Sequence, residues 1–93
     1  MFDRALKRMR EQIRACRYIM PLHAEEEMDA DDLGIYDIES VILTGHIIKR
    51  QKDRASDEWK YLVTGQSVAG NPVTVVVKFS PTGKLIFITV FRG

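Results

Sequence analysis

The chain of 93 residues is too short to bury more than one hydrophobic core, so we expect a single domain over residues 1–93. Its apolar fraction of 45% argues against disorder, and no apolar run approaches the ~20 residues of a membrane-spanning helix. Cys16 is the only cysteine, which excludes an internal disulfide. Because residues 1–17 also lack a signal-peptide pattern, we expect a cytoplasmic protein that does not enter a membrane.

The net charge of +1 hides three segments of alternating sign. Residues 1–17 carry a net charge of +4, residues 22–40 carry −8 without any Lys or Arg, and residues 46–93 carry +5. Such segregation can produce a basic face that attracts a polyanion. The acidic segment can equally neutralise that face inside the fold. The composition therefore permits nucleic-acid binding without predicting it.

A first helix is predicted from apolar residues spaced by three or four positions. These residues are Phe2, Leu6, Met9, Ile13 and Cys16. They form one stripe along a helix over residues 2–16, on which Cys16 is expected to be buried. The stripe is compatible with packing on the domain and equally with pairing against another chain.

Two further helices are predicted before the middle of the chain. Residues 17–20 form a short connector that could be strand-like, and Pro21 suits the first turn of the helix that follows. That helix covers residues 22–31, with carboxylates in its first turns, where the helix dipole favours them. The third helix covers residues 36–43 and ends at Gly45.

From residue 46 onward the spacing of apolar residues becomes strand-like. Four runs rich in β-branched and aromatic residues are predicted as strands, over residues 46–51, 59–66, 73–79 and 85–92. Their connections are short, which favours an antiparallel meander because parallel strands need long crossovers. The predicted fold is therefore α+β, with N-terminal helices followed by a four-stranded antiparallel sheet.

His23 is one of two histidines, and Glu26 and Glu27 follow it at a distance of one helical turn. An imidazole beside carboxylates can transfer protons, and it can equally be a helix-start residue that hydrogen-bonds to backbone. A metal site is disfavoured because the segment has no HExxH pattern, no second histidine on the helix and no cysteine pair. We therefore predict neither a metal nor another cofactor.

Four motifs follow one another along the chain. They are His23-Ala24-Glu25-Glu26-Glu27-Met28, Asp37-Ile38-Glu39-Ser40-Val41-Ile42-Leu43-Thr44-Gly45, Glu58-Trp59-Lys60-Tyr61-Leu62-Val63 and Ile88-Thr89-Val90. In this order they resemble a family of small bacterial proteins known only as a domain of unknown function. The resemblance covers about residues 17–92 and leaves residues 1–16 as an extension helix.

That family is in turn distantly similar to compact ribonuclease toxins of the RelE and BrnT kind, which are encoded beside antitoxins. Those toxins combine helices with an antiparallel sheet and cleave RNA without a metal. The resemblance implies a metal-independent endoribonuclease whose partners would be an antitoxin protein and RNA or the ribosome.

Metal-free RNA cleavage requires a base, an acid and cations that hold the phosphate. His23 is the candidate for acid–base chemistry, while Lys78, Arg50 and Arg92 are the candidate cations. Tyr61 offers a hydroxyl and a stacking face. Lys78 is the most informative of these residues because it interrupts an otherwise apolar strand, although a lysine can also extend its amine from such a strand into water.

A second function is compatible with the same sequence. In this alternative the protein is a non-enzymatic interaction module, and its first helix docks a partner or a second copy to form a homodimer. The acidic helix would then steer a basic partner.

Overall fold

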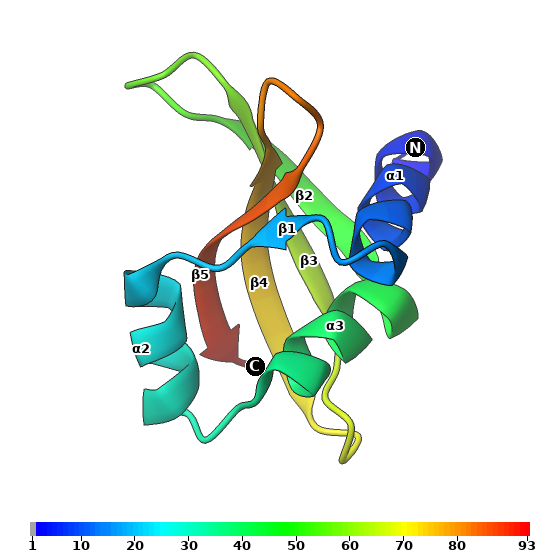
Figure 1. Ribbon diagram of the computed structural model, residues 1–93, viewed down its shortest axis with the longest axis vertical. Helices are drawn as coiled ribbons and strands as arrows, with labels where there is room; N and C mark the ends of the chain where they lie inside the picture. Colours follow the sequence, from blue (N-terminus) through cyan, green and yellow to red (C-terminus); the bar gives the residue numbers. More distant parts are fainter. Residues whose placement is uncertain (1) are drawn as a thin grey trace.

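The computed structural model describes residues 2–93 as three helices and five strands (Figure 1). In chain order they are α1 (Asp3–Arg14), β1 (Tyr18–Ile19), α2 (Leu22–Ala30), α3 (Ile35–Thr44), β2 (His46–Lys52), β3 (Trp59–Gln66), β4 (Pro72–Phe79) and β5 (Leu85–Arg92). The predicted α+β class is confirmed. The predicted helices and the four long strands are all present, with ends that differ from the predicted ones by at most two residues.

The five strands form one sheet in the order β1-β5-β4-β3-β2. β2 to β5 pair antiparallel with their sequence neighbours. The expectation of four antiparallel strands needs a correction, because β1 is a fifth strand that runs parallel to β5, with Tyr18 paired to Leu85. A two-residue strand whose partner lies near the other end of the chain leaves almost no periodic signal in the sequence.

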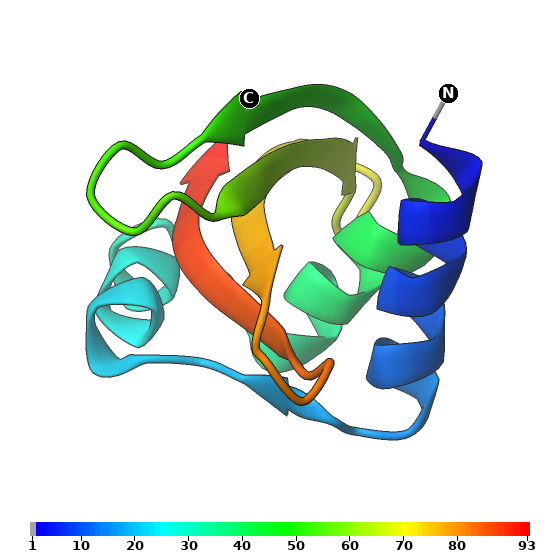
Figure 2. The ribbon, with the colours of Figure 1, turned by 90° about the horizontal axis from the view of Figure 1, so that it is seen from above.

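The helices lie on two sides of the sheet. α3 packs against β3 and β4, and α1 packs against α3 and β5. α2 packs against β5. Figure 2 shows α1 and α3 on one side of the curved sheet, whereas α2 lies beyond β5 on the other side. The basic first helix and the acidic second helix are therefore separated by the sheet.

The hydrophobic core fills the space between α1, α3 and the facing side of the sheet. Val75 lies at its centre and pairs with Val63 on β3 and Val90 on β5, and all three are buried. α1 and α3 contribute the buried side chains Met9, Ile13, Ile38, Val41 and Ile42, and α2 adds Met28 to the same cluster. The apolar stripe of α1 therefore packs on its own domain, which decides between the two uses that the sequence left open.

The opposite side of the sheet, here called the open face, carries a mixture of apolar and polar side chains. Register places Leu62, Val76 and Thr89 side by side across β3, β4 and β5, and Lys78 beside Ile86. All five residues are partly buried. The alternation between this face and the core follows from the two-residue period of a strand.

The prediction of a buried Cys16 is wrong, because this residue is exposed. α1 ends at Arg14, two residues before the apolar stripe does, and Cys16 adopts a positive φ of 55°. The chain turns there so that β1 can reach the edge of β5, and the N–H of Leu85 donates to the carbonyl of Arg17. The tertiary pairing of β1 therefore overrides the helical periodicity.

Two glycines allow α3 to lie directly on β3. A Cβ at Gly65 would collide with the carbonyl oxygen of Val41 and would lie 3.0 Å from the Cα of Gly45. A Cβ at Gly45 would lie 2.5 Å from the same Val41 oxygen and would also collide with the carbonyl of Thr64. This close approach is the reason why both positions need glycine.

We expect Gly65→Ala to lower the free energy of unfolding by about 2–3 kcal/mol, because the added methyl group must push α3 away from β3. Gly34→Ala is the matched control, since a Cβ there would meet only the Oδ2 of Asp37 at 3.7 Å. That variant should lose less than about 1 kcal/mol, the difference between Gly and Ala at a helix N-cap. Urea unfolding of both variants measures the difference, and equal losses would contradict the packing argument.

Candidate functional site

His23 and Glu27 lie one turn apart on α2 and both bind the backbone of β5. The Nε2 of His23 lies 2.5 Å from the carbonyl oxygen of Ile88. A carbonyl only accepts hydrogen bonds, so Nε2 carries the proton in this contact. The N–H of Val90 donates to Oε1 of Glu27 at 3.3 Å. These two bonds satisfy backbone groups on the side of β5 that faces away from β4.

Arg92 continues the same row of contacts. Its Nε donates to the carbonyl of Asp31, the C-cap residue of α2, at 2.8 Å. A cation at this position is favourable because the last carbonyls of a helix form the negative end of its dipole. We call His23, Glu27 and Arg92, with their three backbone partners, the α2–β5 clamp. β1 pairs with the start of β5, and the clamp binds the rest of its edge.

Arg50 and Tyr61 lie together on the other side of the sheet, in register on β2 and β3. Tyr61 packs edge-on between Phe2 and Phe79, with ring centroids at 6.3 and 6.1 Å. The guanidinium carbon of Arg50 lies 4.0 Å from the ring centroid of Trp59. The two residues therefore belong to an aromatic cluster on the α1 side of the sheet.

Lys78 lies on the open face and forms an ion pair. Its Nζ is 3.3 Å from Oε1 of Glu58, with 28% of the Lys78 side chain and 41% of the Glu58 side chain exposed. Tyr61 pairs with Val77, so the antiparallel ladder brings Lys60 next to Lys78. Two lysines and one carboxylate are thereby placed close together at the border of an apolar patch.

The structure does not bring the five predicted site residues to one point. His23 and Arg92 meet in the clamp, Arg50 and Tyr61 meet in the aromatic cluster, and Lys78 lies with Glu58 on the open face. Sequence reasoning missed the pairing of Glu58 with Lys78. The only signal in the sequence was the position of Glu58 directly before β3. The register of β3 and β4 was needed to show that this residue lies close to Lys78.

Tyr18 and Glu39 connect the short strand to α3. The hydroxyl of Tyr18 donates to Oε2 of Glu39 at 2.6 Å, and the Tyr18 ring packs edge-on against Phe87. Burial and then the neighbouring Glu39 carboxylate strongly raise the pKa of Tyr18. This phenol acts as a hydrogen-bond donor to the carboxylate, an interaction that favours its protonated form.

Asp37 connects the start of α3 to the β3–β4 turn. Its Oδ2 accepts from the N–H of Gly34 at 2.9 Å, and its Oδ1 accepts from the N–H of Val68 at 3.0 Å. These bonds, the one from Gly34 most strongly, lower the pKa of Asp37 because they stabilise the charged carboxylate. The side chain thus holds together two segments that are far apart in the sequence.

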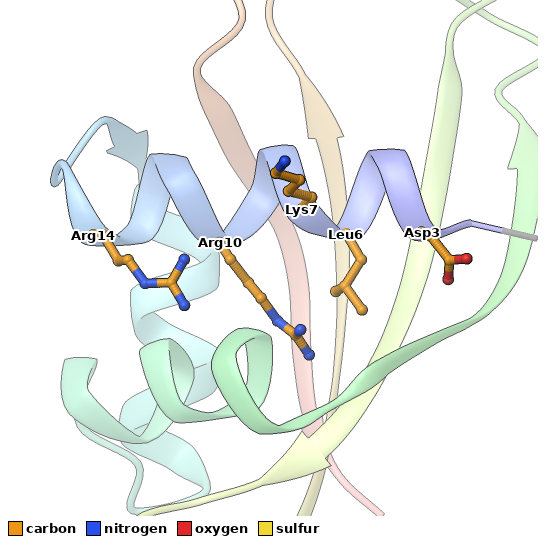
Figure 3. A pocket seen from close by; sticks show the side chains of 5 residues that line it. All are labelled: Asp3, Leu6, Lys7, Arg10 and Arg14. Carbon is orange, nitrogen blue, oxygen red and sulfur yellow. The ribbon is translucent and has the colours of Figure 1, made fainter.

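A hollow of about 270 Å³ lies along α1, lined by Asp3, Leu6, Lys7, Arg10 and Arg14 (Figure 3). The Arg10 side chain extends from α1 to the end of α3. It donates from Nε to the Ile42 carbonyl at 3.1 Å and from Nη2 to the Gly45 carbonyl at 2.9 Å. Arg10 therefore caps α3, and its guanidinium is already bound to two carbonyls at that helix end.

Within residues 2–93, no three His, Cys, Asp or Glu side chains gather in a way that could hold a metal ion. None of the helices over the same residues is long and apolar enough to cross a membrane.

The family model described as Domain of unknown function (DUF4258) matches residues 22–92. The chain therefore belongs to this family, and the match begins at the first residue of α2 and ends at the last residue of β5. No curated protein and no solved structure matches the chain. The predicted membership in a family of unknown function is confirmed.

We expect Glu27→Ala to lower the free energy of unfolding by about 1 kcal/mol, because the N–H of Val90 loses its acceptor. Glu27→Gln keeps an acceptor oxygen and should lie closer to the wild type. Glu26→Ala is the matched control on the exposed side of α2, with a change within about 0.5 kcal/mol. Urea unfolding at neutral pH distinguishes these outcomes, and equal effects at Glu26 and Glu27 would contradict the clamp.

The lowered pKa of Asp37 predicts a pH-dependent contribution to stability. The contribution is complete above the unfolded pKa of about 3.9 and is lost as the pH falls through the lower folded value. Asp37→Ala should therefore cost about 1 kcal/mol at pH ~7, because the N–H groups of Gly34 and Val68 lose their acceptor. This cost should decrease in strong acid, where the wild-type carboxylate is also protonated. Denaturant unfolding of both proteins across this range measures it, and a pH-independent cost would contradict the assignment.

Proposed function

We propose that this protein acts on RNA and cleaves it without a metal, in the manner of the RelE and BrnT toxins to which we expect its family to be distantly similar. The observation that carries the proposal is the pair of Lys78 and Glu58 on the open face, 3.3 Å apart and partly exposed. When a bound phosphodiester separates this ion pair, the carboxylate and the cation can serve the two proton transfers of its cleavage, one on each side of the phosphorus. A cytoplasmic setting agrees with such a substrate.

The reaction would proceed by attack of the RNA on itself. Glu58 would accept the proton of a 2′-hydroxyl, and the resulting oxygen would attack the adjacent phosphorus. Lys78 would stabilise the negative charge that develops on the phosphate and would donate a proton to the 5′-oxygen as its bond to phosphorus breaks. The products are a 2′,3′-cyclic phosphate and a new 5′-hydroxyl, so no metal, oxidant or other reactant is required.

The surroundings of the pair suit a nucleotide. Lys60 adds a second cation next to Lys78, where it could hold a neighbouring phosphate. Leu62, Val76 and Thr89 offer a partly exposed surface against which a ribose or base could pack. The open face therefore provides cations at its border and an apolar centre.

The other predicted site residues receive different roles in this proposal. His23 and Arg92 hold α2 on β5 and would contribute indirectly, whereas Arg50 and Tyr61 lie on the opposite side of the sheet. The acid–base role first assigned to His23 remains a competing hypothesis. The activity of His23→Ala, divided by the fraction of the variant that is folded, distinguishes the two hypotheses. A direct catalytic role predicts that this corrected activity falls, and an indirect role predicts that it stays near the wild-type value.

If the protein is instead an interaction module, a partner would have to bind a side of α1 other than its apolar stripe. Met9 and Ile13 are buried in the core, so a homodimer through this stripe would require α1 to leave its own domain. The exposed side of α1 instead presents Arg4, Lys7 and Arg14. A partner that docks there, such as an antitoxin protein, would need an acidic surface.

We expect the purified protein to cleave single-stranded RNA in the presence of EDTA and to leave 2′,3′-cyclic phosphate ends. Lys78→Met should reduce the rate by about 100-fold or more, the effect typical of losing one donor that stabilises a developing oxyanion. Lys84→Met removes the same charge from the exposed β4–β5 turn and should keep the wild-type rate. Gel analysis of a labelled RNA measures all three.

Intact RNA after incubation with folded wild-type protein, both alone and with ribosomes, would contradict this function. Cleavage that Lys78→Met leaves unchanged would instead contradict the assigned site. Circular dichroism of each variant confirms that lost activity does not reflect lost folding.

A further inference from the structure

A continuous row of aromatic rings and cations crosses the α1 side of the sheet. We call it the Trp59 strip, and it consists of Arg8, Arg50, Lys52, Trp59, Tyr61 and Phe79. The guanidinium carbon of Arg8 lies 4.2 Å from the centroid of Phe79, and the rings of Phe79 and Tyr61 are 6.1 Å apart. Arg50 lies 4.0 Å and Lys52 5.2 Å from the centroid of Trp59.

The register of β2 and β3 explains this arrangement. Arg50 pairs with Tyr61 and Lys52 pairs with Trp59, so two cations and two aromatic rings alternate on one face of the hairpin. Phe2, directly before α1, packs against Tyr61 and leaves that ring partly buried. Trp59 lies beyond this cover and is 42% exposed. A large aromatic surface flanked by cations is thereby available to a ligand.

The acidic segment does not neutralise this strip. α2 lies on the far side of the sheet (Figure 2), and neither of the two ion pairs within residues 2–93 uses a carboxylate of residues 22–40. Within residues 2–93, the one carboxylate that forms an ion pair with a cation of the strip is that of Asp57, 3.4 Å from the Nζ of Lys52. Arg8 and Arg50 face aromatic rings rather than carboxylates.

We propose that the Trp59 strip binds single-stranded nucleic acid. An unpaired base would stack on the Trp59 ring in place of the Arg50 guanidinium, a planar group that lies 4.0 Å from the ring centroid. Arg50, Lys52 and Arg8 would follow the phosphates of the strand. Paired bases cannot offer their faces to Trp59, so the strip selects single strands over duplexes. The site lies on the opposite side of the sheet from Lys78 and Glu58, and its binding does not require cleavage.

Trp59 is the only tryptophan of the chain, so its fluorescence reports directly on the strip. The probes are oligo(dT) and 2′-O-methyl oligo(U), which lack the 2′-hydroxyl needed for cleavage. We expect both to quench the fluorescence and to bind with a log–log salt slope of about −2, as expected for three phosphate contacts on a single strand. Duplex DNA of equal charge should quench weakly, and heparin, which has no bases, should not quench by stacking.

Fluorescence anisotropy of a labelled oligonucleotide tests the residues. Trp59→Leu should weaken binding by roughly tenfold, the loss of one stacked base, whereas Trp59→Phe keeps a ring and should lose less. Arg50→Gln should weaken binding and reduce the salt slope by about 0.7. Arg14→Gln makes the same charge change at the far end of α1 and should bind as the wild type does.

Equal binding of heparin and oligo(dT), or unchanged affinity of folded Trp59→Leu and Arg50→Gln, would overturn the proposal. Lys78→Met separates it from the proposed cleavage, because that variant should lose the reaction and still quench. Wild-type protein that quenches without cleaving any RNA would contradict the proposed function alone.

Discussion

The attachment of α2 to the edge of β5 is the constraint on which the rest of the structure depends. A long edge strand exposes unpaired N–H and C=O groups, and proteins must pair or cover them. Here β1 pairs with the start of β5, and the side chains of His23 and Glu27 bind its later backbone groups. This solution fixes where both helical segments before α3 run. It also fixes where the carboxylates of α2 lie, because the helix that carries them is held beyond β5.

The position of α2 also decides the electrostatics. The acidic α2 is held beyond β5, whereas α1 lies on the other side of the sheet (Figure 2). Charges separated by more than about 10 Å of solvent are largely screened at ordinary salt, so each side presents its own field to a partner. A chain of nearly zero net charge can therefore combine a basic surface with an acidic one. The region that matches the family of unknown function, residues 22–92, includes all residues of the α2–β5 clamp.

The two proposed sites would use the two faces of the sheet for different chemistry on the same class of ligand. The open face carries Lys78 with Glu58, a pair suited to proton transfer at a phosphate, and the α1 side carries Trp59 with Arg50, a pair suited to stacking. β2 is an edge strand with Lys49 directed to one face and Arg50 to the other. A single strand that passes around this edge would meet cations on both sides. Through the cations of β2, one nucleic-acid strand could reach both proposed sites, although neither site requires the other.

The sequence by itself determined the class of fold, the extent of most elements and the family, because these features depend on local periodicity and on turn residues. It also singled out His23 and Lys78, one through its neighbours and one because it interrupts an apolar strand. Only the tertiary structure decided what those residues touch. The pairing of β1 with β5, the turn at exposed Cys16, the clamp and the Lys78–Glu58 pair join segments distant in sequence. Such contacts depend on strand register and sheet order, for which a single chain of residues carries no local signal.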